Sequence, residues 1–106
     1  MALTITSENF EAEVLKSEVP VVIDVFATWC GPCQQVAPIF DELAKELEGT
    51  YKLVKINIDD ERDIAINYNV SSIPTFLFIK GGELVSKEMG YHSKEDLKKK
   101  IEKVFG

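Results

Sequence analysis

The sequence predicts an α/β fold built on one mixed, five-stranded sheet with helices on both faces. Five short segments rich in apolar and β-branched residues alternate with segments whose apolar residues recur at helical spacing. The last two strand-like segments are separated only by Gly81-Gly82, which fits a two-residue hairpin turn. Alternation implies parallel pairing through right-handed crossovers, whereas the closing hairpin adds antiparallel strands. The predicted order is therefore βαβαβαββα.

The composition of the five predicted strands indicates which of them lie inside the sheet and which lie at its edge. They are residues 3–5, 21–27, 53–58, 75–79 and 83–89. The first is a short edge strand. The second is almost continuously apolar, which is typical of a strand covered on both faces, and Asp24 interrupts it. The third is a second inner strand with Lys55 at its middle, and Gly90 ends the fifth.

Four helices are predicted from caps and apolar spacing. The expected N-caps are Thr6 or Ser7 for the first helix, Asp59 with Asp60 for the third, and Ser93 for the fourth. Glu8 and Glu11 would give the first helix an acidic first turn. The expected inward-facing residues are Phe10 and Val14, then Val36, Ile39, Phe40, Leu43 and Leu47, then Ile64 and Tyr68, then Leu97, Ile101, Val104 and Phe105. Pro38 lies inside the second helix and should bend it.

Length and charge exclude several classes of protein. A chain of 106 residues predicts one domain, residues 1–106, which we expect to be a monomer. A formal charge of -6 argues against nucleic acid and anionic membrane surfaces as partners. No segment has the length and apolar character of a membrane span, and the first residues lack a basic segment followed by an apolar one. We therefore expect a cytoplasmic protein.

The two cysteines are the strongest chemical signal. Cys30 and Cys33 are the only cysteines, and they lie between a buried strand and a helix. A zinc site normally needs four ligands, and the chain adds only His92. A disulfide across so short a loop would add little stability, so the spacing favours a redox pair that opens and closes. At a helix N-terminus, Cys30 should favour its thiolate, and Cys33, one turn later, should be the more covered, resolving thiol.

Asp24 and Lys55 are the candidate proton-handling residues. Asp24 lies among Val and Ile residues, where desolvation raises the pKa of a carboxyl group, so it could accept the Cys33 proton near neutral pH. The alternative is a buried acid held by a hydrogen bond or by Lys55. Lys55 either tunes Asp24 or extends its ammonium group to solvent.

A set of ordered landmarks resembles the thioredoxin family over the whole chain. They are Asp24, Trp29-Cys30-Gly31-Pro32-Cys33, Pro38, Lys55, Ile73-Pro74-Thr75 and Gly90. The resemblance implies the thioredoxin fold, a cis bond before Pro74, Cys30 as nucleophile and Cys33 as resolving thiol. It also implies a shallow substrate-binding patch formed by Trp29, Gly31, Pro32, Ile73, Pro74, Thr75 and Gly90, although Trp29 could instead be a core residue.

The function that the resemblance implies is protein-disulfide reduction. It implies disulfide-containing protein substrates, no bound cofactor or metal, and reducing equivalents from NADPH through thioredoxin reductase. A disulfide isomerase or oxidase, a non-catalytic binding module, and a metal site shared between two chains remain alternatives. The chain departs from the bacterial pattern at Phe26, Gln34, Ser72 and Tyr91-His92, which puts redox poise and partner preference in question. We treat His92 as a loop residue.

Overall fold

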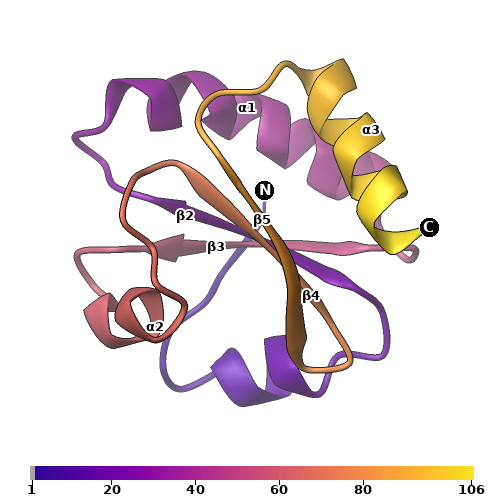
Figure 1. Cartoon of the computed structure of the whole chain (residues 1–106), viewed down its shortest axis with the longest axis horizontal. Helices are drawn as coiled ribbons and strands as arrows, with labels where there is room; N and C mark the ends of the chain where they lie inside the picture. Colours follow the sequence, from indigo (N-terminus) through magenta and orange to yellow (C-terminus); the bar gives the residue numbers. More distant parts are fainter. Residues whose placement is uncertain (1) are drawn as a thin grey trace.

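The computed structural model describes residues 2–106; Met1, the first residue of the expected domain, lies outside the described residues. The elements, in order, are β1 (Leu3–Thr4), the π-helix η1 (Glu11–Leu15), β2 (Val21–Phe26), α1 (Gly31–Glu46), β3 (Lys52–Asn57), α2 (Arg62–Asn67), β4 (Thr75–Lys80), β5 (Glu83–Met89) and α3 (Lys94–Phe105). Strands and helices therefore follow the predicted order (Figure 1).

The five strands form one mixed sheet in the order β1-β3-β2-β4-β5. β3 pairs in parallel with both β1 and β2, whereas β4 runs antiparallel to β2 and β5 antiparallel to β4. Gly81 and Gly82 join the last two strands with φ angles of +60° and +82°. Two positive φ angles are what a tight hairpin turn requires, and glycine adopts them without steric cost. The α/β fold and the hairpin are both confirmed.

Helices cover both faces of the sheet, with α1 and α3 on one side and α2 with η1 on the other (Figure 1). Successive side chains of a strand point to opposite faces, so β2 contributes Val22 to the α1 side and Ile23 to the other side. The core on the α1 side includes Val22, Val36, Phe40, Leu43, Phe76, Phe78, Leu97 and Ile101. The core on the opposite side includes Ile5, Val14, Ile23, Val25, Val54, Ile56, Leu77 and Ile79. The same alternation assigns Asp24 to the face of β2 that α1 covers.

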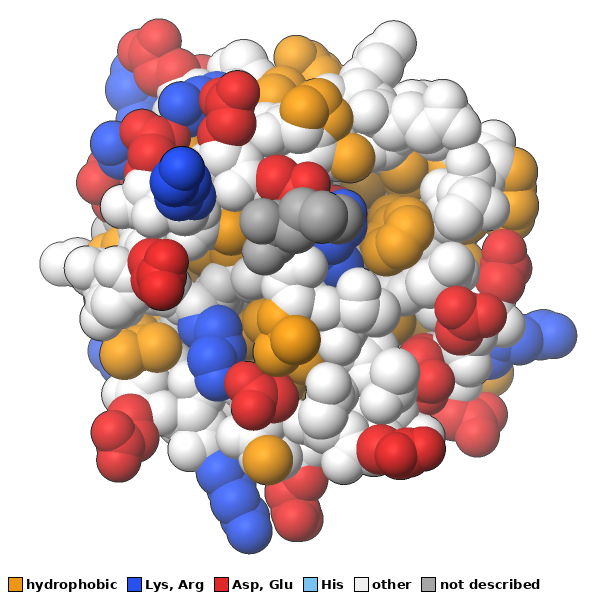
Figure 2. All heavy atoms as spheres, turned by 180° about the vertical axis from the view of Figure 1, so that it is seen from behind, with side chains coloured by type: hydrophobic (Ala, Val, Ile, Leu, Met, Phe, Trp, Pro, Cys, Tyr) orange, Lys and Arg blue, Asp and Glu red, His pale blue; other side chains and the backbone are white. Residues whose placement is uncertain are grey.

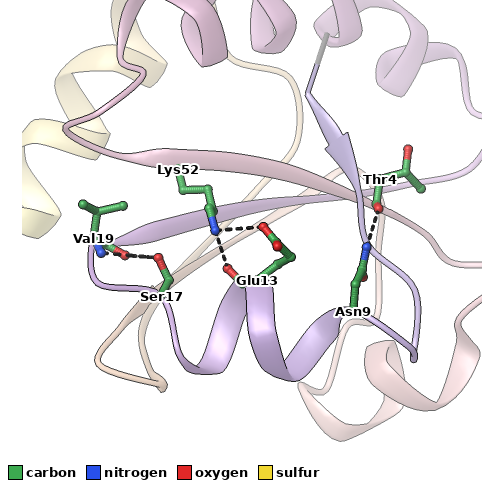
Figure 3. Close-up of polar contacts among 6 residues, drawn as sticks. All are labelled: Thr4, Asn9, Glu13, Ser17, Val19 and Lys52. Atoms are coloured by element: carbon green, nitrogen blue, oxygen red, sulfur yellow. Dashed lines mark hydrogen bonds and ion pairs between the residues drawn. The ribbon is translucent and has the colours of Figure 1, made fainter.

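The first helix differs from its prediction. It begins at Glu11 after Phe10 and has no side-chain cap, so the expected caps at Thr6 and Ser7 were wrong, and its acidic first turn contains Glu11 and Glu13 rather than Glu8. The physical reason is a local hydrogen-bonding turn that competes with the helix. The Asn9 side chain accepts from the Thr6 N–H at 2.7 Å. It also donates to the Thr4 carbonyl at 3.2 Å (Figure 3).

A partly exposed ion pair fixes η1 to the sheet. The Lys52 ammonium group, at the start of β3, donates to the carbonyl of Glu13 at 3.1 Å and to its carboxylate at 2.9 Å (Figure 3). After the helix, the Ser17 hydroxyl donates to the Val19 carbonyl at 2.8 Å and orders the turn into β2. This short helix is thus held by tertiary contacts, which is how short helices generally gain stability.

The other predicted caps had mixed outcomes. Ser93 does cap α3, because its hydroxyl accepts from the N–H of Asp96 at 3.2 Å. Asp59 and Asp60 do not cap α2, which begins after Glu61 without a side-chain cap bond. Asp59 lies in a turn instead, where its N–H donates to the Asn57 side chain at 2.9 Å.

The surface reflects the negative charge of the chain. Figure 2 shows basic and acidic side chains interleaved along one edge and acidic side chains in excess at the opposite edge. Lys94 of α3 contacts Glu42 and Glu46 of α1 at 3.2 and 2.6 Å. These exposed ion pairs link the two helices. Within the described part of the chain, no helix combines the length and the apolar character needed to cross a membrane.

Candidate active site

Cys30 and Cys33 form a disulfide at the start of α1, with their Cα atoms 5.2 Å apart. Cys30 is the N-cap residue of the helix, and its Sγ accepts a hydrogen bond from the Cys33 N–H at 3.2 Å. The first N–H groups of a helix lack partners within it and carry partial positive charge, which stabilises negative charge on a nearby sulfur. Cys30 therefore has the position at the helix N-terminus that the sequence predicted.

The two sulfurs differ slightly in exposure. Cys30 is 6% exposed and Cys33 is 3% exposed, and both cluster with Ala27, which directly follows β2. Ile73, from the loop before β4, packs against the same small cluster. The order agrees with the prediction that Cys33 is the more covered thiol. A partner must therefore approach the disulfide from the side of Cys30.

Asp24 is a buried acid on β2. Neither of its oxygens accepts a hydrogen bond from any of residues 2–106. Burial raises the pKa of Asp24 to about 7, Lys55 opposes that rise, and Asp41 adds to it. The alternative in which a hydrogen bond holds this acid is not supported, and the carboxyl group can gain and lose a proton near neutral pH.

A cavity of about 230 Å³ joins this carboxyl group to the second cysteine. Its lining consists of Asp24, Phe26, Ala27, Thr28, Cys33, Gln34, Ala37 and Lys55. The lining is mostly apolar, and the volume exceeds what one water molecule needs. The Gln34 amide donates to the Thr28 carbonyl at 2.7 Å, at the rim of the cavity. The arrangement places the side chains of Cys33 and Asp24 on one shared cavity.

Lys55 belongs to a network that the sequence showed only in part. It pairs in register with Asp24, but its Nζ lies 3.8 Å from the carboxylate of Asp41 and 5.2 Å from the centre of the Phe26 ring. With 14% of its side chain exposed, it does not extend freely into solvent. Asp41 was not predicted as a site residue, although it lies eight residues after Cys33 on α1, a spacing that returns to a similar face of the helix.

The loop before β4 brings backbone groups to the disulfide. The Ile73–Pro74 bond is cis, and the Ile73 carbonyl oxygen lies 3.8 Å from Cys30 Sγ. The N–H of Gly90 donates to the Pro74 carbonyl at 2.8 Å, which joins this loop to the end of β5. Thr75 is buried, and its hydroxyl donates to the Ser72 carbonyl at 2.5 Å, so its side chain faces away from the surface patch.

Trp29 lies on the surface beside the disulfide. It is 68% exposed, so the interpretation of Trp29 as a core residue was wrong. Its indole N–H donates to the Asp59 carboxylate at 2.8 Å. Asp59 therefore binds Trp29 and does not cap a helix. Gly31 and Pro32 are exposed next to it. A groove of about 370 Å³ follows, lined by Trp29, Ile58, Asp59, Arg62, Ala65, Ile66, Val70, Ser71, Ser72 and Ile73.

Comparison with known proteins agrees with this geometry. A family model described as thioredoxin matches residues 1–103. Thioredoxin 1 of Nostoc sp. is 44% identical over 102 residues, covering 96% of this chain and 95% of that protein. The thioredoxin of Rickettsia bellii is 43% identical over 97 residues, covering 92% of each chain. The thioredoxin of Haemophilus influenzae is 43% identical over 95 residues, covering 90% of this chain and 89% of that protein.

Proposed function

The chain belongs to the thioredoxin family, and from that premise we propose how its residues divide the work of the reaction. The protein is a thiol–disulfide oxidoreductase that acts on protein disulfides. The observation that carries this function is the Cys30–Cys33 disulfide at the N-terminus of α1. A non-catalytic binding module and a disulfide isomerase or oxidase are not favoured.

In the proposed reaction, the reduced protein passes two electrons to a substrate disulfide. The Cys30 thiolate attacks one substrate sulfur, forms a mixed disulfide and releases the other substrate sulfur as a thiolate. The Cys33 thiolate then attacks Cys30 Sγ, closes the disulfide and releases the second substrate thiolate. The hydrogen bond from the Cys33 N–H to Cys30 Sγ supports this assignment, because it stabilises negative charge on the attacking sulfur.

We assign Asp24 as the acceptor of the Cys33 proton. The shared cavity and a pKa of about 7 support this role, because a base works best when its pKa lies near the working pH. Lys55 is assigned a tuning role, since its positive charge favours the ionised form of Asp24. Neither residue contacts the substrate in this scheme.

The proposed substrate-binding patch surrounds Cys30. An extended substrate segment would lie across Trp29, Gly31, Pro32, Ile73, Pro74 and Gly90, and would hydrogen-bond to backbone groups as an added strand does. Support comes from the exposed Trp29 side chain and from the Ile73 carbonyl beside Cys30 Sγ. Thr75 would contribute through its backbone alone, because its side chain is buried.

The electron source and the cellular setting are further proposals. We infer that NADPH supplies the reducing equivalents through thioredoxin reductase, and that no cofactor or metal is bound. We further propose that residues 1–106 act as a single, monomeric domain that contributes to redox homeostasis in the cytoplasm. The family and the redox-active cysteine pair support these proposals.

Reduction of insulin, followed with two electron donors, tests the proposal. The first reaction contains NADPH and a bacterial thioredoxin reductase, and the second contains dithiothreitol; a Cys30→Ser variant is the control in each. We expect both reactions to reduce insulin and the variant to match the uncatalysed rate. If insulin is reduced in the dithiothreitol reaction but not in the NADPH reaction, the proposed electron source is contradicted. If insulin is reduced in neither reaction, the proposed function is contradicted.

A further inference from the structure

His92 connects the end of β5 to the last helix. Its Nδ1 lies 2.9 Å from the carbonyl oxygen of Gly90, and because a carbonyl only accepts, Nδ1 carries the proton. Its Nε2 faces a carboxylate oxygen of Glu88 at 3.6 Å, and the other oxygen of Glu88 contacts Lys100 of α3 at 3.0 Å. The ring packs against Phe76 in a T-shaped arrangement, with the ring centres 5.8 Å apart. The imidazole therefore lies against Gly90, Glu88 and Phe76.

Gly90 is fixed through both of its backbone polar groups. Its N–H donates to the Pro74 carbonyl at 2.8 Å, and its carbonyl accepts from His92. Its φ is +87°, which L side chains rarely adopt, and the space where a Cβ would lie is open. Gly90 has no side chain to anchor it, so its two hydrogen bonds contribute directly to its position, and one of them depends on His92.

We propose that His92 is a positioning residue for protein substrates, and that it acts by holding the Gly90 peptide in place beside Pro74 and the disulfide. The inference rests on the proposed substrate-binding patch, to which Gly90 and Pro74 belong. A peptide edge that is ordered before binding does not have to be ordered during binding, which lowers the cost of association. A small disulfide needs only the Cys30 sulfur and should not depend on this edge.

The geometry also argues against a role for His92 in proton transfer. Nδ1 is occupied by the Gly90 carbonyl, Nε2 faces Glu88, and 19% of the side chain is exposed. A general base needs a free nitrogen within hydrogen-bond distance of the proton that it removes. The structure gives His92 contacts that hold it in place instead.

Two variants test the inference, one that removes the donor and one that restores it. His92→Leu keeps a side chain of similar bulk without a donor, whereas His92→Asn can place its amide nitrogen near the position of Nδ1. Each is assayed with dithiothreitol as reductant on insulin and on hydroxyethyl disulfide. For His92→Leu we expect KM for insulin to rise about fivefold, the order of one net hydrogen bond, with kcat and the rate on hydroxyethyl disulfide unchanged. His92→Asn should return KM to within about twofold of the parent value.

A second measurement is independent of turnover. Amide hydrogen exchange at the Gly90 N–H should become faster in His92→Leu and return toward the parent rate in His92→Asn. An unchanged KM for insulin in His92→Leu would overturn the inference, as would an equal loss of activity on both substrates, because damage to the core would explain that result. If the parent protein fails to reduce insulin at all, the proposed function fails instead.

Discussion

Lys55 stands beside Asp24 in the register of two parallel strands, yet its ammonium group lies 3.8 Å from the carboxylate of Asp41. Two acids thus compete for one lysine, and Asp24 receives no hydrogen bond from any residue in the range 2–106. Burial therefore outweighs the attraction of Lys55 and raises the pKa of Asp24 to about 7. Near neutral pH, this carboxyl group is about half protonated.

Asp24 should make the stability of the protein depend on pH. Its pKa is about 7 when folded, against 3.8 as the usual value, so below about pH 4 both states hold the proton. As the pH rises from about 4 to about 7, the unfolded chain ionises first and the folded state loses about 4 kcal/mol relative to it. We expect Asp24→Asn to remove this loss. Urea unfolding at about pH 5 and about pH 8 should show roughly 3 kcal/mol of this loss, because the unfolded chain is already mostly ionised at about pH 5.

The matched control for this stability experiment is Asp60→Asn, which removes an exposed acid of the same kind. It should keep the pH dependence of the parent protein. Identical pH dependence in the parent protein and Asp24→Asn would show that Asp24 ionises normally when the chain is folded.

Asp24→Asn should also slow the closing of the disulfide. An amide cannot accept the Cys33 proton, so resolution of the mixed disulfide should be slower by roughly tenfold or more at neutral pH. The inflection near pH 7 in the pH profile of the resolution rate should also disappear. Stopped-flow measurement of substrate release from a preformed mixed disulfide gives this rate. A rate and a profile equal to those of the parent protein would dismiss the proton-transfer role.

Asp41→Asn should shift the pH profile of mixed-disulfide resolution to lower pH, whereas burial of Asp24 shifts it to higher pH. Asp41 raises the pKa of Asp24 and also attracts Lys55, whose charge lowers it. Removing Asp41 therefore lowers the pKa of Asp24, and the midpoint of the resolution profile should shift to lower pH. Glu42→Gln is the control, because Glu42 pairs with Lys94 on the surface. A midpoint that does not move, or that rises, would contradict this account of the network.

The Trp29–Asp59 hydrogen bond should be visible in fluorescence. Trp29 is the only tryptophan, so its emission reports on one site. In Asp59→Ala the indole N–H loses its partner, and we expect shifted emission, faster acrylamide quenching and stability lowered by about 1 kcal/mol. Asp60→Ala should change none of these. Spectra of Asp59→Ala that match the parent protein would mean that the contact does not persist in solution.

Local patterns in the sequence predicted most of the framework. The alternation of residues along 21–27 is enough to assign Asp24 to the same face as Val22, and that face is the one that α1 covers. Helical spacing likewise gave the buried face of α1 and the position of Cys30 at its start. These features depend on near neighbours in the chain, which is why the sequence shows them.

Contacts between distant residues explain the parts that the sequence did not predict. Asp59 appeared to be a helix cap, but it accepts a hydrogen bond from Trp29, which is 30 residues away. Asp41 lies on the correct helix face, yet only the folded sheet brings Lys55 to it. His92 appeared to be an ordinary loop residue because its contacts with Gly90 and Glu88 depend on the turn after β5.

The central claim is that Cys30 is the sulfur that attacks, and trapping of the mixed disulfide tests it most directly. A Cys33→Ser variant cannot release its substrate by closing the disulfide, so it should accumulate an adduct with a protein disulfide. Mass spectrometry should find one substrate bound to each chain, through Cys30, and no adduct in Cys30→Ser. An adduct in Cys30→Ser that forms through Cys33 at a comparable rate would contradict the account.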